Sequence, residues 1–507
     1  MAKNCERYRD RRSSLCNIPK MAANWGDIGR TVPIDVLTDD VLLHIFDFCF
    51  PDKPGSFIPD KTEVWQELVH VCRRWRELVF RSSRRLDLQL LCTTRTPAEE
   101  MLNIWPALPL VIRVDYRPGM KNISAALKHR DRISGISISH PSSSLLSPSR
   151  SLLPPEIQKP FPTLKSLDIK SPQDLREGMD DIPYLFSGGL VPHLQHLQLE
   201  TPSFPTLLPM LLCSTTNLLT ITLRLWETPR FGCILPEAIV TVLAALTSLE
   251  SFYLTIKSRA QSDQSPGQES RPPPPRTRFS LPTLTYFMFK GESEYLEDLV
   301  AGIDASPLLD RLEVYLFYQP KFYMPHLSQF ISRVPRYQAL DDASMVISGG
   351  VVSVKAPSNG QGMLTMGIIS HNGSGWRPSF LAQLCASSLP LSFLVLKDLY
   401  MRFPLLYWQS SDNEHAQWLE LLSPFTAVEN LYLSRRFVPC IAHALQEVDG
   451  ERVTEVLPAL RNLYLAELQP LGPAQQAIEQ FVCARRLSTH PIAVSQWDVG
   501  ETMGGSW

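Results

Sequence analysis

The chain has 507 residues, more than one compact domain contains unless it is an elongated array of repeats. Its hydrophobic share of 44% suffices for a large core, and its net charge of −2 excludes a general electrostatic attraction to nucleic acid or membrane. The N-terminus carries no secretory signal, no apolar run is long enough to span a bilayer, and the ten cysteines show no paired or Cys/His spacing. We therefore expect reduced thiols in a cytoplasmic or nuclear protein without metal or cofactor.

The N-terminal part of the chain contains a basic tail and two short helical patterns. Residues 1–30 have few large apolar side chains, which predicts disorder. Within 31–90, the first pattern places apolar residues at steps of three and four: Val41, Leu42, Ile45, Phe46 and Phe48. The second forms a stripe with a flanking row: Trp65, Leu68, Cys72, Trp75 and Val79, beside Val64, Val71 and Leu78. These wide, aromatic-rich faces favour a plug that seats in a groove of another protein.

The same residues resemble the F-box, the module that docks substrate receptors onto the Skp adaptor of SCF-type ubiquitin ligases. The start of the family pattern corresponds to 37–46, and the signature Val-Cys-Arg-x-Trp-Arg-x-Leu is present at 71–78. Thr38 stands where the family has proline, and an insertion at 51–63 separates the helices. The resemblance implies adaptor contacts, with Phe46 and Trp75 as main anchors, from seven residues: Leu37, Leu42, Ile45, Phe46, Val71, Trp75 and Leu78.

Beyond the helical patterns the sequence predicts strands and helices in alternation. We expect a strand at 86–92, a helix at 101–105 and a strand at 110–116. The pattern apolar-x-x-apolar-x-apolar then recurs with starts 23 to 37 residues apart: Ile133, Leu164, Leu194, Leu218, Leu249, Leu284, Leu309, Met363, Leu391, Val428 and Leu460, with a weaker copy near Leu340. In a chain this apolar the number of copies carries no weight, but their spacing does.

Helical patterns lie between these strands. They occupy 236–246, 295–303, 326–334, 380–389 and 418–422. Many strands follow a proline-containing segment such as Phe161-Pro-Thr-Leu164 or Leu281-Pro-Thr-Leu284. Proline holds the residue before it in an extended conformation and stops the preceding helix, so these segments predict where each strand begins.

One strand and one helix per unit predict an α+β or α/β solenoid: a small helical F-box module followed by a leucine-rich-repeat array over 91–495. The layout also resembles the large fungal class of F-box proteins with divergent leucine-rich repeats. Positions between the leucines are expected to line the concave face: Lys165, Asp168, Gln195, His196 and Gln198. Flexible insertions are expected at 141–160 and 258–278, a loop-rich region at 349–375 and a flexible tail at 496–507. The alternative is an open parallel sheet of βαβ units, which the number of units disfavours.

The sequence contains no recognisable catalytic motif. It lacks the phosphate-binding, dinucleotide-binding, zinc-helix and nucleophile-elbow patterns, so we expect no enzymatic activity. A run of arginines lies on or just after the second helical pattern: Arg73, Arg74, Arg76, Arg81, Arg84 and Arg85. Glutamates dilute this run, so we interpret it as solvated cations and not as a nucleic-acid site.

The resemblance implies a substrate-recognition subunit that binds the Skp adaptor, and through it cullin and RING subunits, and holds an unidentified protein target on the repeats. It implies no nucleic-acid or membrane partner. A second hypothesis is a repeat scaffold unrelated to ubiquitin, whose first helices cap the apolar end of the solenoid. A third, an enzyme on an α/β sheet, requires a pocket of perturbed ionisable groups that the sequence does not indicate.

Overall fold

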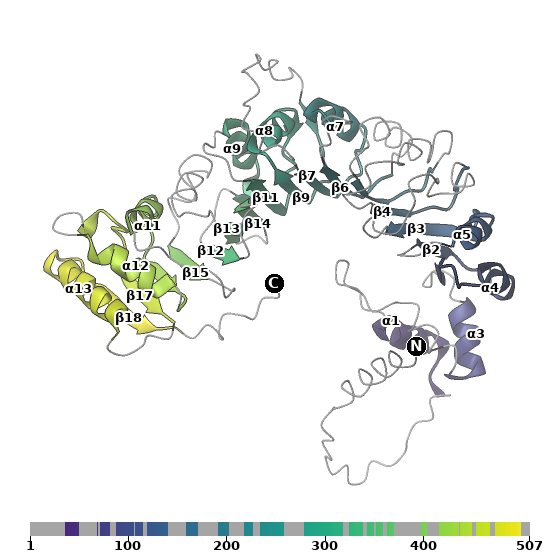
Figure 1. The fold of residues 1–507 in the computed structure, drawn as a ribbon, viewed down its shortest axis with the longest axis horizontal. Helices are drawn as coiled ribbons and strands as arrows, with labels where there is room; N and C mark the ends of the chain where they lie inside the picture. The colour runs from purple at the N-terminus through teal and green to yellow at the C-terminus, as the bar shows by residue number, and fades with distance from the viewer. Residues whose placement is uncertain are drawn as a thin grey trace, which may run out of the picture. The chain divides into compact units, whose positions relative to one another are not determined.

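Two compact units, Met1–Ser83 and Arg84–Trp507, make up the chain in a computed structural model (Figure 1). The structure describes residues 36–49, 68, 71–81, 88–105, 107–114, 119–139, 159–170, 191–201, 217–226, 234–257, 278–317, 324–337, 342–348, 351–357, 362–369, 397–402, 415–435, 437–448, 453–466 and 472–497. The expected N-terminal tail, the insertion at 51–63, most of the other two insertions and the helix at 380–389 lie outside these residues.

The N-terminal unit contains helices α1 (Asp39–Cys49) and α3 (Arg73–Arg81). The carbonyl oxygen of Thr38 accepts a 3.1 Å hydrogen bond from the N–H of Leu42, so the helical ladder starts at Thr38. Two acidic residues in the first turn of α1 and Arg81 in the last turn of α3 match the signs of the helix-end dipoles.

The C-terminal unit is built on one sheet of sixteen strands. Its order is β1-β2-β3-β4-β5-β6-β7-β9-β11-β14-β13-β12-β15-β16-β17-β18. The first strands are β1 (Leu88–Leu91), β2 (Leu110–Val114), β3 (Ile133–Ser139), β4 (Ser166–Lys170), β5 (His196–Thr201), β6 (Thr220–Trp226), β7 (Ser251–Lys257), β9 (Tyr286–Gly291) and β11 (Arg311–Phe317). The others are β12 (Asp342–Ser348), β13 (Val351–Pro357), β14 (Met363–Ile369), β15 (Asp398–Arg402), β16 (Asn430–Leu433), β17 (Asn462–Leu465) and β18 (Ala493–Gln496).

Neighbouring strands of this sheet are parallel, except that β13 is antiparallel to both β12 and β14. The fold is therefore α/β with a large, mostly parallel sheet. Because β1 pairs with β2, it belongs to the sheet, and the predicted module boundary at residue 90 falls inside a strand.

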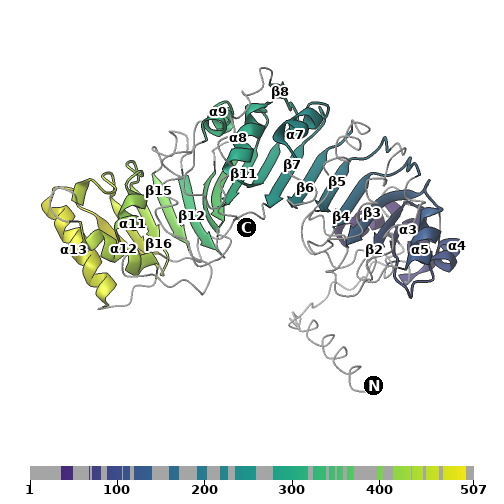
Figure 2. The same ribbon diagram turned by 45° about the horizontal axis from the view of Figure 1, so that its top comes forward.

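Helices of the C-terminal unit cover one side of the sheet (Figures 1 and 2). They are α4 (Ala98–Ile104), α5 (Met120–Leu127), α7 (Pro236–Leu243), α8 (Ser293–Ala301), α9 (Pro325–Ser332), α11 (His415–Leu422), α12 (Phe437–Gln446) and α13 (Pro473–Leu487). A short 3-10 helix, η5 (Pro335–Tyr337), follows α9 in the chain. A small parallel pair, β8 (Phe279–Ser280) and β10 (Ile303–Asp304), lies apart from the large sheet. The other side of the large sheet is called here the open face.

A four-residue turn precedes many of the strands. The N–H of its fourth residue donates to the carbonyl of its first, at 3.4 Å for Leu164 and Phe161 and at 3.2 Å for Leu284 and Leu281. Both residues are fully buried in each case. The proline-containing segments thus form turns with proline at the second position, where its fixed backbone angle fits. The prediction that they mark strand starts is confirmed.

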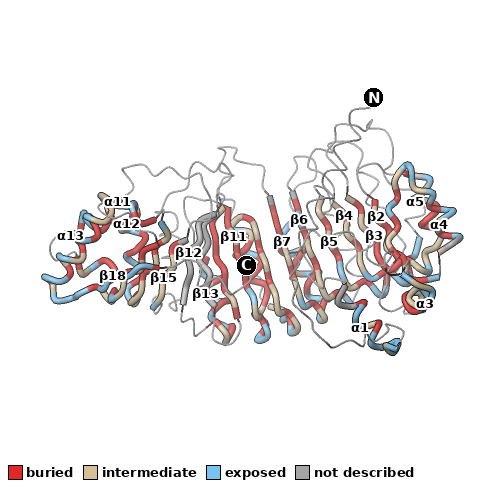
Figure 3. Tube along the Cα trace, turned by 90° about the horizontal axis from the view of Figure 1, so that it is seen from below, coloured by how far each residue is buried: buried red, intermediate tan, exposed pale blue. Residues whose placement is uncertain are grey.

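Side chains along the strands alternate between the core and the open face (Figure 3). In β4, Leu167 and Ile169 are buried, whereas Ser166, Asp168 and Lys170 are partly exposed. The buried rows stack from strand to strand and pack toward the helices, as in the 5.6 Å ring stacking of Phe252 on Phe287. Each unit therefore buries its apolar residues mainly against its neighbours.

The prediction of a loop-rich region at 349–375 is wrong for 351–357, whereas the repeat expected at Met363 is present as β14. Residues 351–357 form β13, which lies between β12 and β14 and is antiparallel to both. Consequently β11 pairs with β14 and not with β12, and the simple succession of units expected near Leu340 is broken. Val351, Val352 and Val354 give β13 the branched residues that favour strands.

The repeat at Leu391 lies outside the described residues, and the strand that pairs with β16 is β15. Leu399 and Met401 are the buried positions of that strand. They belong to a copy of the apolar pattern, starting at Leu396, that the sequence interpretation overlooked in favour of Leu391. The predicted tail also starts too early. Gln496 is in β18, and Trp497 is buried and donates a backbone hydrogen bond to the carbonyl oxygen of Leu465.

Glu297 on α8 caps the neighbouring helix α9. Its two carboxylate oxygens accept hydrogen bonds from the backbone N–H groups of His326 at 2.9 Å and Leu327 at 2.8 Å. These N–H groups have no partner inside a helix, so the carboxylate replaces a local cap. Burial raises the pKa of Glu297, and the two hydrogen bonds act in the opposite direction.

Arg485 on α13 also satisfies backbone groups of a neighbouring segment, in this case carbonyl oxygens. This fully buried side chain donates to the carbonyl oxygens of Val453 at 3.2 Å, Leu457 at 3.0 Å and Leu460 at 3.3 Å. Leu457 has a positive φ of 51°, which is strained for a leucine. The guanidinium therefore holds a strained turn by satisfying carbonyl groups that are shielded from water.

Replacing Arg485 with methionine should lower the free energy of unfolding by about 2–4 kcal/mol, because several buried carbonyls lose their donors. The measurement is urea denaturation of the full chain. Arg486→Met is the matched control, since Arg486 is adjacent and exposed, and it should change the midpoint little. Equal midpoints for the two variants would show that the buried hydrogen bonds do not hold the turn.

Candidate protein-binding surfaces

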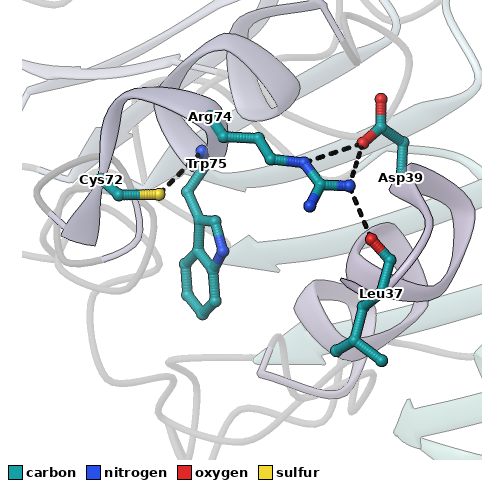
Figure 4. Close-up of polar contacts among 5 residues, drawn as sticks. All are labelled: Leu37, Asp39, Cys72, Arg74 and Trp75. Atoms are coloured by element: carbon teal, nitrogen blue, oxygen red, sulfur yellow. Dashed lines mark hydrogen bonds and ion pairs between the residues drawn. The ribbon is translucent and has the colours of Figure 1, made fainter. Parts of the chain in front are cut away.

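Arg74 of α3 connects to the start of α1 (Figure 4). Its Nε donates to Oδ1 of Asp39 at 3.2 Å, and Nη2 donates to the same oxygen at 2.7 Å and to the carbonyl oxygen of Leu37 at 2.6 Å. The Asp39 side chain is mostly exposed, so the ion pair contributes only about 0.2–1 kcal/mol. Its effect is to orient α1 against α3. The interpretation of Arg74 as a merely solvated cation is therefore wrong.

Cys72 begins α3. Its Sγ accepts a 3.4 Å hydrogen bond from the N–H of Trp75, and its carbonyl accepts one from the N–H of Arg76 at 3.1 Å. The thiol thus occupies the place of a helix-capping side chain. The edge of one ring meets the face of the other where Phe46 contacts Trp75, with centroids 4.8 Å apart. This contact joins the apolar sides of the two helices.

The seven predicted adaptor contacts fall into three groups. Leu42, Phe46 and Leu78 are buried within this chain, and Leu37 and Trp75 are half-buried. Ile45 and Val71 are exposed, with 39% and 58% of their surface accessible. The exposed Val41 lies one helical turn before Ile45 on α1, so these two share a face. Trp65 and the side chain of Phe48 lie outside the described residues.

The open face of the sheet offers the second candidate surface. The expected positions Asp168, Gln195 and Gln198 are half-buried, and Lys165 and His196 are exposed. The strand register brings Asp168 beside Gln198. These residues therefore alternate with buried leucines as the sequence predicted.

A cluster around Glu313 at the middle of the open face was not predicted. Its carboxylate accepts from Nε of Arg311 at 2.5 Å and from the hydroxyl of Tyr315 at 3.2 Å. The Arg311 guanidinium also lies over the ring of Tyr286, 5.3 Å from its centroid, and that ring contacts Tyr253 at 4.7 Å. Burial, with the adjacent Glu313 charge, raises the pKa of Tyr315 to about 12. One buried carboxylate thus fixes aromatic and arginine side chains, the residue types that dominate binding hot spots.

A tyrosine ladder forms a second feature of the open face. Tyr400, Tyr432 and Tyr464 stack with centroid distances of 4.1 and 4.4 Å, and Trp497 meets Tyr432 edge to face at 5.5 Å. A hydrogen-bonded row of polar side chains runs beside them. The amide of Asn462 donates to the side-chain oxygen of Asn430, and the amide of Asn430 donates to the carboxylate of Asp398, at 2.7 Å in both cases. The equal spacing of 32 residues between these strands aligns identical side chains.

These clusters were missed because alternation shows only which side of the sheet a residue faces. The pattern places Tyr253, Tyr286 and Glu313 on the open face, but their contact depends on the register between strands. That register is set by turns and helices of unequal length, which the local pattern does not reveal.

Comparison with known proteins adds no assignment: no family model matches the chain, and a search of curated proteins finds no similar one. Within the described ranges, no group of three or more His, Cys, Asp or Glu side chains is placed to hold a metal ion. No helix in that part of the chain has both the length and the apolar character needed to cross a membrane. Cys72, Cys92, Cys440 and Cys483 are free thiols. Burial raises the pKa of Cys92 to about 12.

Because Phe46 is buried and Ile45 is exposed, substitutions at these adjacent positions of α1 should change the stability of the helix pair by very different amounts. Phe46→Ala should destabilise the helix pair by about 3–5 kcal/mol, because it opens a cavity beside Trp75. Ile45→Ala, at an exposed position, should change the stability by less than about 0.5 kcal/mol. Hydrogen exchange of α1 and α3 amides in the full chain measures both. Similar protection in the two variants would contradict the assignment of Phe46 to the core.

Proposed function

We propose that the chain is a substrate-recognition subunit of an SCF-type ubiquitin ligase. Its F-box-like helices dock the Skp adaptor, its sheet acts as a leucine-rich-repeat solenoid, and a protein target binds the open face. The observation that carries the proposal is the arrangement at α1 and α3. The family signature folds so that Phe46 and Trp75 hold the helices together while Ile45 and Val71 remain exposed.

Exposed apolar side chains support docking at the N-terminal unit. Val41 and Ile45 form an apolar stripe on α1, and Val71 is more than half exposed just before α3. Grouped apolar residues on a soluble surface mark interaction sites more often than scattered ones do. A partner groove that covers them supplies the burial that the unit itself leaves incomplete.

Recurring local structure supports the solenoid. The same turn precedes successive strands, and the carbonyl before one strand accepts two N–H groups from the start of the next: Lys165 from Gln195 and His196, and Glu429 from Arg461 and Asn462. The helices lie on one side of the sheet, whereas an open βαβ sheet of the doubly wound type has helices on both sides. These features are typical of stacked repeats.

In this role the chain itself breaks no covalent bond. The adaptor would connect it to cullin and RING subunits that position a charged ubiquitin-conjugating enzyme. Holding the target in the same assembly raises its effective concentration near the ubiquitin thioester. The alternative is the scaffold hypothesis, in which the helices cap the apolar end of the array.

Adaptor binding tests the proposal. The full chain should bind a purified Skp-type adaptor, and the double variant Ile45→Ala/Val71→Ala should weaken binding at least about tenfold, because central apolar contacts dominate such interfaces. Isothermal titration calorimetry gives the dissociation constants.

Leu235→Ala/Leu308→Ala is the matched control. Both leucines are as exposed as the docking residues but lie in the C-terminal unit, and their loss should leave binding unchanged. An adaptor that binds the docking variant and the wild type within twofold of each other would refute the docking assignment.

A further inference from the structure

One register row of the open face carries a cation at every second strand. Lys170 of β4 is beside Glu200 of β5, which is beside Arg224 of β6. Arg224 is beside Thr255 of β7, and Thr255 is beside Lys290 of β9. The three cations therefore form a line across the strands. Two strand spacings separate each cation from the next, about 10 Å.

The ion pairs of this region have their cations outermost. Lys170 is 41% exposed and its partner Asp168 is 22% exposed, at a separation of 2.9 Å. Arg224 is 47% exposed against 22% for Glu200, and Arg311 is 50% exposed against 10% for Glu313. Elsewhere both orders occur: the carboxylate is the more exposed partner in the Arg74–Asp39 and Arg333–Asp304 pairs, and the cation is the more exposed partner in the Arg73–Glu77 and Arg461–Glu429 pairs.

This arrangement has an electrostatic consequence. In the row, a carboxylate fixes the ammonium group of Lys170 and the guanidinium group of Arg224, and each group still presents N–H donors outward. Arg224 reaches Glu200 through Nη1 alone of its three nitrogens. From β4 to β9 the row thus carries three cations, Lys170, Arg224 and Lys290, and one carboxylate, Glu200.

We propose that this row, Lys170–Arg224–Lys290, binds an acidic segment of the target protein in the polyproline II conformation, laid across the strands. The inference rests on the proposed role of the open face in target binding and names the chemistry of the target. Polyproline II repeats every three residues and rises about 3.1 Å per residue, so every third side chain lies on one side about 9 Å apart. Carboxylates at positions i, i+3 and i+6 then match the spacing of the three cations.

The neighbouring residues suit such a segment. Thr255, which lies between Arg224 and Lys290 in the row, is a small residue and carries no charge that would repel a carboxylate. Tyr253 and Tyr286 are half-buried on the adjacent strands and offer ring faces on which proline side chains pack.

The test uses the full chain and a fluorescein-labelled peptide of several Glu-Pro-Pro repeats, with binding measured by fluorescence anisotropy. We expect saturable binding that weakens as the salt concentration rises from about 0.05 to about 0.3 M, because the contacts are partly exposed ion pairs. A Gln-Pro-Pro peptide, and a peptide of the same composition with its glutamates consecutive, should each bind at least about tenfold more weakly.

The triple variant Lys170→Gln/Arg224→Gln/Lys290→Gln should reduce affinity for the Glu-Pro-Pro peptide at least about tenfold. Lys121→Gln/Arg333→Gln/Arg486→Gln is the control, since it removes the same charge from the helices and the segments that follow them, and it should bind as wild type does. Circular dichroism of both variants checks that the fold is retained.

Three outcomes would overturn the proposal: equal binding by the two triple variants, equal binding of the spaced and consecutive glutamate peptides, or tighter binding of single-stranded DNA or of a phosphoserine-Pro-Pro peptide. Adaptor binding by the row variant separates this inference from the proposed function. If the adaptor binds but the peptide does not, only the acidic-segment inference fails. If the peptide binds but the adaptor does not, the ligase role fails and the basic row stands.

Discussion

The fold depends on the fact that one strand–helix unit of this chain cannot shield its own apolar side chains. Leu167 and Ile169 of β4 are buried only because β3 and β5 lie beside them in register and the rows continue from strand to strand. Turns with buried first and fourth residues fix where each strand starts, and shared carbonyl acceptors connect each start to the preceding one. Stability therefore accumulates from contacts between neighbours. The hydrogen bonds of the Glu297 and Arg485 side chains follow the same rule, since each side chain satisfies backbone groups of an adjoining unit.

The same constraint leaves the open face available for recognition. Its side chains alternate with the core positions, so their identity affects binding more than folding. Residues there nevertheless support one another across the strands: Glu313 fixes Arg311 and Tyr315, and Glu200 fixes Arg224. A surface whose side chains are already fixed loses less conformational entropy when a partner binds. Pre-organisation of this kind is expected of a binding surface and has no evident purpose on a face that only meets solvent.

The sequence predicts the units far better than their succession. Apolar spacing identifies β4, β9 and β11 because their core residues follow a local rule, and proline-containing turns locate the strand starts. It fails at β12–β14, where the chain reverses twice and only hydrogen bonding between distant residues determines which strand follows β11. It also fails for the Glu313 cluster, because contact across strands depends on register. At α1 and α3 the motif identifies the residues that matter, but not that Phe46 faces inward and Ile45 outward.

That distinction bears on how a docking motif of this kind works. A residue that is buried in the free chain cannot supply new buried area to a partner unless the helices separate, so in the proposed docking role Phe46 and Leu42 would contribute by holding α1 and α3 in position. Arg74 and Cys72 act likewise, the first by fixing the start of α1 and the second by capping α3. In the proposed complex the gain in burial would come from Ile45, Val71 and Val41, which the free chain leaves exposed. The signature at 71–78 thus combines a residue that joins the two helices, Trp75 in contact with Phe46, with a residue that stays exposed, Val71.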